Sequence, residues 1–256
     1  MATRSTSVGT LIHSRDSPYA RRVRIVLAEL GLPYASQLHP TVYAIPDLEA
    51  LAPTLRVPVW QDDHGTVFDS GLIVEYLLSR YGTPDSGGGS VPGGGSAPGD
   101  SAPGSGPPPG DAYASGGALP PLARALRRPE HPWADGKLLA TLGDLMDAGF
   151  LLRQLALSGV EEEHVRYLQR VRQRIASALN WLEGRATPAG FVPGTFSLPD
   201  VWLVCALAWA EFRGTYAWRG RPTLEALMAR LATRPSVAET AHEAWQLRKN
   251  HCTRGS

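Results

Sequence analysis

Ser17-Pro18 separates a short apolar run from an amphipathic segment, and this transition is the strongest constraint on the fold. Residues 9–13 (GTLIH) suit a buried strand, and apolar residues then recur at helical spacing until Gly31 and Pro33 stop the pattern. We expect Ser17 to cap this helix and Pro18 to occupy its first position. Because free backbone N–H groups and the positive end of the helix dipole meet beside Ser17, the sequence predicts a site that attracts an anion.

The next segments complete a small α/β unit. In chain order we expect a strand over 34–38, a helix over 47–51, strands over 56–61 and 66–68, and a helix over 70–77. Pro58 follows Val57 at the start of the third strand, where a proline belongs at an edge or in a cis turn. Asp69-Ser70 is a helix-capping pair.

The second half of the chain predicts helices only. The expected helices span 138–155, 165–182, 201–212, 223–233 and 237–248. Ser197 and Asp200 form a capping box ahead of the third of these and are expected to serve folding. The arginines at 166, 170 and 174 are expected to form a solvated face of their helix.

Charge and cysteine content limit the function classes. A formal net charge of +1 provides no strong field for nucleic acid or an anionic membrane, so we expect neither as a partner. No apolar run reaches the roughly 18 residues of a membrane span, and residues 1–8 lack a signal-peptide core. Cys205 and Cys252 do not form a disulfide framework. These features predict a cytoplasmic protein.

The order of elements resembles the glutathione transferase family. Ser17-Pro18-Tyr19-Ala20 stands where thioredoxin-like oxidoreductases carry Cys-Pro-Tyr-Cys, and the serine is similar to that of serine-type transferases, including bacterial members. Val57-Pro58 resembles the cis-proline dipeptide of the family. The resemblance implies an α/β plus all-α fold, with a thioredoxin-like domain over 8–83 and an all-helical C-terminal domain over 122–250.

Residues 84–121 are dominated by Gly, Pro, Ser and Ala, and they are expected to form a flexible linker between the two domains. In the family this connection is short, so the segment is an insertion. Neutral expansion is the favoured interpretation, with a lid or a docking arm as the alternative.

The resemblance also implies how glutathione, the co-substrate, is bound. Ser17 would be the catalytic residue, because a hydroxyl that donates to sulfur at a helix N-terminus favours the thiolate. The backbone of Val57, presented by Pro58, would pair with the cysteinyl part of glutathione. Asp69 would bind the γ-glutamyl ammonium, and Ser70 would bind the adjoining carboxylate. No metal is expected.

The residue that holds the glycyl carboxylate stays open. His39, Tyr43, Gln61 and Arg56 are available. Arg56 is the simplest choice, because it directly precedes Val57, although an ordinary surface arginine explains it equally well.

A second substrate would bind in a cleft between the domains. The candidates for its lining are Trp133, Asp147, Phe150 and Arg153, which lie on or just before the first long helix of the second domain. Asp147 and Arg153 would polarise a substrate carbonyl or pair across the domain interface. Tyr19 is expected to be a packing residue of the first helical turn.

These features predict a dimeric glutathione transferase that acts in detoxification, with Ser17 activating glutathione for attack on a small hydrophobic electrophile. Two alternatives stay open. A glutathione-dependent isomerase or ether-cleaving enzyme begins with the same thiolate, and a transferase-fold interaction module would need no turnover. Substrate identity and the oligomeric interface are not encoded in any visible motif.

Overall fold

A computed structural model describes residues 7–81, 126, 128, 130–161 and 165–241 of the chain. The predicted linker over 84–121 and Cys252 lie outside the described residues.

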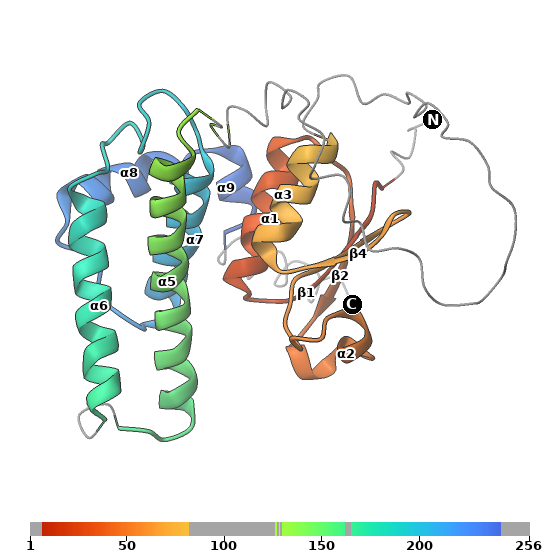
Figure 1. The fold of residues 1–256 in the computed structure, drawn as a ribbon, viewed down its shortest axis with the longest axis horizontal. Coiled ribbons are helices and arrows are strands. Elements are labelled where there is room, and N and C mark those ends of the chain that lie inside the picture. Colours follow the sequence, from red (N-terminus) through yellow and green to blue (C-terminus); the bar gives the residue numbers. More distant parts are fainter. Residues whose placement is uncertain (1–6, 82–125, 127, 129, 162–164, 242–256) are drawn as a thin grey trace, which may run out of the picture.

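The first part of the chain forms a mixed four-stranded sheet with helices on both faces (Figure 1). Its elements are β1 (Thr10–Ser14), α1 (Pro18–Glu29), β2 (Ala35–His39), the 3-10 helix η1 (Val42–Ala44), α2 (Leu48–Leu51), β3 (Val59–Asp62), β4 (Gly65–Phe68) and α3 (Ser70–Tyr81). The strand order is β2-β1-β3-β4. β1 is parallel to β2 and antiparallel to β3, and β3 and β4 form a hairpin. The predicted order of elements is confirmed.

Side chains alternate between the two faces of this sheet, as the period of a strand requires. Leu11 and Trp60 are completely buried in a core shared with α1 and α3. The neighbouring residues Ile12 and Val59 belong to a smaller core with Leu48 of α2. β1 and β3 therefore each anchor a helical layer on both sides of the sheet.

The second part of the described chain is helical, as predicted. It contains α5 (Pro132–Leu157), α6 (Arg166–Glu183), α7 (Leu198–Arg213), α8 (Pro222–Ala232) and α9 (Pro235–Glu239). The predicted capping box is present: the Ser197 N–H donates to the Asp200 carboxylate at 2.9 Å, and both residues are fully buried. Among the described helices, none is both long and apolar enough to span a bilayer.

The last predicted helix, over 237–248, differs from the structure. α9 begins at Pro235 and ends at Glu239, and the hydroxyl of the following residue, Thr240, donates to the Ser236 carbonyl at 2.8 Å. Residues 242–248 of that prediction lie outside the described residues.

α1 and α3 lie between the sheet and the helical domain (Figure 1), and α1 packs against both α7 and α9. Arg21 of α1 donates to the Val237 carbonyl at 3.2 Å, and Arg234 donates to the Glu29 carboxylate at 2.7 Å. α1 therefore brings its N-terminus, with Ser17, to the boundary between the domains.

Candidate active site

Ser17 caps α1 as predicted. Its backbone is extended (φ −68°, ψ 116°), and its hydroxyl oxygen accepts the Ala20 N–H at 3.1 Å. Pro18 occupies the first helical position and has no N–H to satisfy. Because the Ser17 oxygen already accepts one bond, the hydroxyl proton remains available to a ligand outside the helix.

Val57 lies beside the N-terminus of α1. The Val57-Pro58 peptide bond is cis, as predicted. The ladder between β1 and β3 ends where Ile12 faces Val59, and two further steps of this register put Val57 opposite Ser14. Within the described residues the backbone of Val57 forms no hydrogen bond to other backbone groups. Its N–H and C=O can therefore pair with an extended peptide.

Asp69 and Ser70 open α3. Asp69 is exposed and has a left-handed backbone (φ 71°), and its Oδ1 accepts the N–H groups of Gly71 at 2.8 Å and Leu72 at 3.1 Å. Ser70 is buried at the first helical position. Asp69 is thus a helix cap, but the cap uses Oδ1 alone, so Oδ2 can accept a hydrogen bond from a ligand.

Arg56 is exposed and lies within electrostatic range of Tyr19 on the first turn of α1. Burial and the bond to Asp147 raise the pKa of the Tyr19 phenol, and the charges of Arg22 and Arg56 oppose that rise. The Arg56 charge is therefore close enough to act on the first turn of α1.

Of the four residues predicted to line the second-substrate cleft, Asp147 and Phe150 contact α1. The Tyr19 hydroxyl donates to the Asp147 carboxylate. The Phe150 ring packs edge-on against Tyr19, with centroids 6.3 Å apart, and stacks on Trp209 of α7 at 6.1 Å. Tyr19 is therefore more than the packing residue that we expected, because it also pairs across the domain interface.

Trp133 and Arg153 are not brought to this cluster by any described contact. Trp133 lies on the first turn of α5, is 83% exposed, and precedes Asp147 by fourteen residues, which is about 21 Å of helix. Arg153 is half-buried one turn beyond Phe150.

Sequence reasoning missed three charged residues at this boundary. Arg213, at the end of α7, donates to Asp16 at 2.7 Å, directly beside Ser17. Arg22 of α1 is only 4% exposed. Arg22 lies on the same face of the helix as Pro18 and Ile25, which are buried. This spacing could have predicted from the sequence that Arg22 is buried too.

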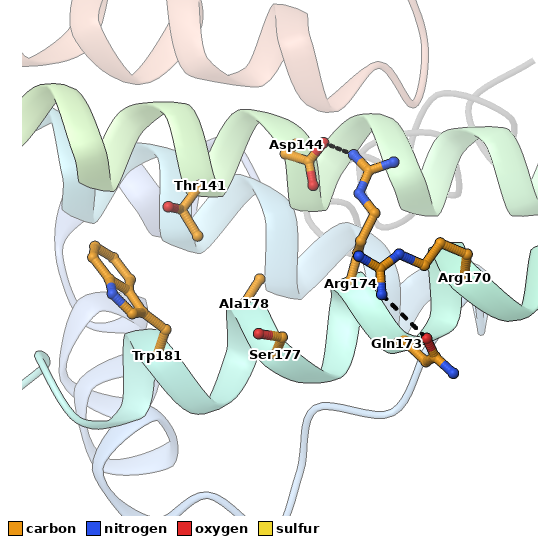
Figure 2. A pocket seen from close by; sticks show the side chains of 8 residues that line it. All are labelled: Thr141, Asp144, Arg170, Gln173, Arg174, Ser177, Ala178 and Trp181. Atoms are coloured by element: carbon orange, nitrogen blue, oxygen red, sulfur yellow. Dashed lines mark hydrogen bonds and ion pairs between the residues drawn. The ribbon is translucent and has the colours of Figure 1, made fainter.

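A groove on the helical domain is separate from this site (Figure 2). It has a volume of about 320 Å³, and its lining comes from α5 and α6: Thr141, Asp144, Arg170, Gln173, Arg174, Ser177, Ala178 and Trp181. Arg166 and Arg170 are exposed, as predicted for a solvated face, but Arg174 is half-buried and forms an ion pair with Asp144. The Arg174 side chain is still 40% exposed, so it pairs with a carboxylate of α5 at the solvated edge of that face.

A second cavity, of about 680 Å³, is lined by residues of η1, α2 and the adjoining loops, among them the exposed Tyr43 and Leu55. Neither cavity includes Ser17, Asp69 or Asp147. In the described ranges, no group of three or more His, Cys, Asp or Glu side chains is placed to hold a metal ion.

The sheet is mixed and has a cis-proline before β3, and a helical domain packs on α1. These two features define a two-domain protein with a thioredoxin-like N-terminal domain. Two sequence models of one family match it. The "Glutathione S-transferase, N-terminal domain" matches residues 11–85, and the "Glutathione S-transferase, C-terminal domain" matches residues 166–232. Together they cover more than half of the chain, which belongs to the glutathione S-transferase family.

Solved structures agree with this assignment. A glutathione transferase family member from Pseudomonas fluorescens with bound glutathione has a TM-score of 0.65 and 26% identity, covering 91% of this chain and 98% of its own. A glutathione S-transferase from Methylobacterium radiotolerans, in complex with glutathione sulfonate, has a TM-score of 0.65 at 23% identity, with coverages of 91% and 94%. The second likeness concerns the fold alone.

Curated relatives match a shorter region. The "Stringent starvation protein A homolog" of Histophilus somni is 35% identical over 83 residues, which is 32% of this chain and 39% of that protein. A "Glutathione S-transferase-like protein" of Aspergillus fumigatus is 37% identical over 73 residues, 27% of this chain and 32% of its own length. The chain therefore matches only about a third to two fifths of the length of these relatives.

Proposed function

We propose that the chain is a glutathione transferase in which Ser17 donates a hydrogen bond to the glutathione thiolate. The observation that carries this proposal is the bond from the Ala20 N–H to the Ser17 oxygen, which leaves the hydroxyl proton as the group to be donated. A free thiol titrates near ~8.5, so only a few per cent is thiolate at neutral pH. A donor at a helix N-terminus lowers that pKa without a general base.

The described residues fit the rest of glutathione. The free backbone groups of Val57, ahead of Pro58, would pair with its cysteinyl unit. Oδ2 of Asp69 would bind the γ-glutamyl ammonium, and the N-terminus of α3 at Ser70 would bind the carboxylate beside it. Arg56, which acts electrostatically on Tyr19, is our candidate for the glycyl carboxylate.

The electrophile would lie against Phe150, the only member of the Tyr19, Phe150 and Trp209 cluster that is exposed. A flat apolar ring suits a small hydrophobic electrophile. Arg153, one turn further along α5, would bind a polar substituent, whereas Asp147 already accepts the Tyr19 hydroxyl. We assign no substrate role to Trp133, which lies about four helical turns before Asp147 on α5. A cytoplasmic homodimer acting in detoxification completes the proposal by family resemblance.

Two alternatives remain. An isomerase or an ether-cleaving enzyme would use the same thiolate and would differ only in its electrophile. An interaction module without turnover is the second alternative, since several curated relatives of the N-terminal region are named Stringent starvation protein A homologs and not transferases. Retention of Ser17, Val57-Pro58 and Asp69-Ser70 supports the transferase instead, because a module that only binds proteins needs no glutathione site.

The test is a pH titration of thiolate absorbance for glutathione bound to the protein, together with turnover of a chloronitrobenzene. Ser17→Ala removes both the cap and the donor, Ser17→Gly removes the donor but remains a fair cap, and Ser17→Thr keeps both. We expect the thiol pKa to be lowered in the wild type and Ser17→Thr, and to return toward ~8.5 in the other two variants, with turnover falling. Binding without any Ser17-dependent shift, or no binding, would favour the interaction module.

A further inference from the structure

Arg22 is a buried cation that pairs with no carboxylate among the described residues. It lies on α1, five residues after Ser17, and is 4% exposed. In the part of the chain that the structure describes, its Nε and Nη2 atoms are inaccessible to solvent and have no hydrogen-bond partner. A buried charge of this kind is costly, so its presence calls for a physical reason.

Two aromatic rings hold the guanidinium. Its central carbon lies 5.2 Å from the ring centroid of Tyr19 and 4.6 Å from that of Trp202. Aromatic faces attract a cation but do not neutralise it as a carboxylate would. Tyr19 belongs to the first domain and Trp202 to the second, so the charge lies on the boundary between them.

The titratable groups that act on Arg22 leave its charge in place. Burial lowers the pKa of Arg22, and Cys205, Tyr19, Asp147 and Asp69 oppose this decrease. Asp147 accepts the Tyr19 hydroxyl, and Oδ1 of Asp69 caps α3. An arginine remains protonated in a protein, so a full positive charge stays in a dry environment where little screens it.

The direction of the side chain brings this charge to the start of the helix. Helical side chains tilt toward the N-terminus, and the guanidinium of Arg22 accordingly lies over the ring of Tyr19 on the first turn. Five residues correspond to about 7.5 Å along the axis. The charge therefore lies on the order of 10 Å from Ser17, on the side of the helix covered by α7.

We propose that Arg22 is a positioning residue whose buried charge, held between Tyr19 and Trp202, adds to the positive potential at the N-terminus of α1 and stabilises the glutathione thiolate at Ser17. This inference rests on the proposed transferase function. It differs from the role of Ser17 because Arg22 acts through space, without touching the sulfur.

The experiment measures the thiol pKa of bound glutathione by thiolate absorbance in the wild type, Arg22→Met and Arg22→Lys. A unit charge at about 10 Å in a protein environment corresponds to roughly one pKa unit. We expect Arg22→Met to raise the thiol pKa by about one unit and Arg22→Lys to stay within a few tenths of the wild type. The affinity for S-methylglutathione, which has no thiol to ionise, should change by less than about threefold.

Arg24→Met is the matched control, since it removes the same charge from a half-buried position on α1. Solvent screens that position, so we expect a shift below about 0.3 units. An unchanged thiol pKa in Arg22→Met, with normal binding of S-methylglutathione, would overturn the proposal. If Arg22→Met does not fold, a pKa raised by a full unit in folded Arg22→Lys overturns it equally.

The two proposals fail in different ways. A Ser17-dependent shift that is insensitive to Arg22 rejects only the role of Arg22. A wild-type protein that leaves the glutathione thiol at its usual pKa rejects the transferase function and this inference together.

Discussion

Tyr19 donates its hydroxyl proton to the carboxylate of Asp147, and this hydrogen bond ties the first turn of α1 to the long helix α5. The two residues are 128 positions apart and belong to different domains. Tyr19 is two residues from Ser17, so the bond fixes the position of Ser17 relative to Phe150 on α5.

The Tyr19–Asp147 bond should contribute measurably to stability. We expect Tyr19→Phe to lower the free energy of unfolding by about 1 kcal/mol, because the phenol loses its acceptor while the ring keeps its packing. Asp147→Asn in the same background tests the pairing by a double-mutant cycle in urea. A coupling energy near zero would show that the bond is not stabilising in solution.

Glu29 should make stability depend on pH. Burial alone would raise the pKa of Glu29, but the hydrogen bonds from Arg234 and Ser236 outweigh it and hold that pKa below its usual value of 4.5. A lowered pKa in the folded state stabilises the protein above the pKa of the unfolded chain, and this contribution is lost as the pH falls through the folded value.

We therefore expect Glu29→Gln to cost about 1 kcal/mol at pH 7, where Arg234 is paired but partly exposed, and progressively less below pH ~4.5. Urea unfolding of both proteins between pH 7 and pH 3 measures the difference. A difference that stays constant over this range contradicts the prediction.

Asp69 caps α3 and is proposed to bind the γ-glutamyl ammonium of glutathione. Two substitutions separate these two roles. Asp69→Asn keeps an oxygen for the Gly71 and Leu72 N–H groups and tolerates the left-handed backbone, so stability should stay within about 0.5 kcal/mol. Its affinity for glutathione should fall about tenfold, because the ammonium loses its carboxylate. Calorimetric titration measures this.

Asp69→Ala is the comparison variant for that experiment. It loses the cap as well as the charge, so it should also lower the free energy of unfolding by about 1 kcal/mol or more. Full affinity in Asp69→Asn would show that the residue is a helix cap alone.

Two glycines of α5 should respond in opposite directions to alanine. A Cβ at Gly149 would lie 2.7 Å from Cε1 of the Tyr216 ring, whereas a Cβ at Gly143 would meet no atom within 4 Å. Gly149→Ala should therefore destabilise the protein by about 1–3 kcal/mol, and Gly143→Ala should stabilise it by up to about 1 kcal/mol. Thermal unfolding of both variants tests the pair, and equal effects would refute the close packing at Gly149.

The local chemistry of the chain determined much of the fold. Ser17-Pro18, Val57-Pro58 and the Ser197/Asp200 box each act through neighbours within a few residues, so their outcome could be predicted from spacing alone. The order of strands and helices followed from hydrophobic periodicity for the same reason.

The tertiary structure decided which side chains surround Ser17. Trp133 and Phe150 share one helix and were equally plausible from the sequence, but only Phe150 meets Tyr19. The Asp16–Arg213 pair joins residues 197 positions apart, and the position of Arg22 between Tyr19 and Trp202 depends on how α7 packs on α1. Periodicity shows that a helix has a buried face, but the partner of that face depends on long-range packing, which no local pattern encodes.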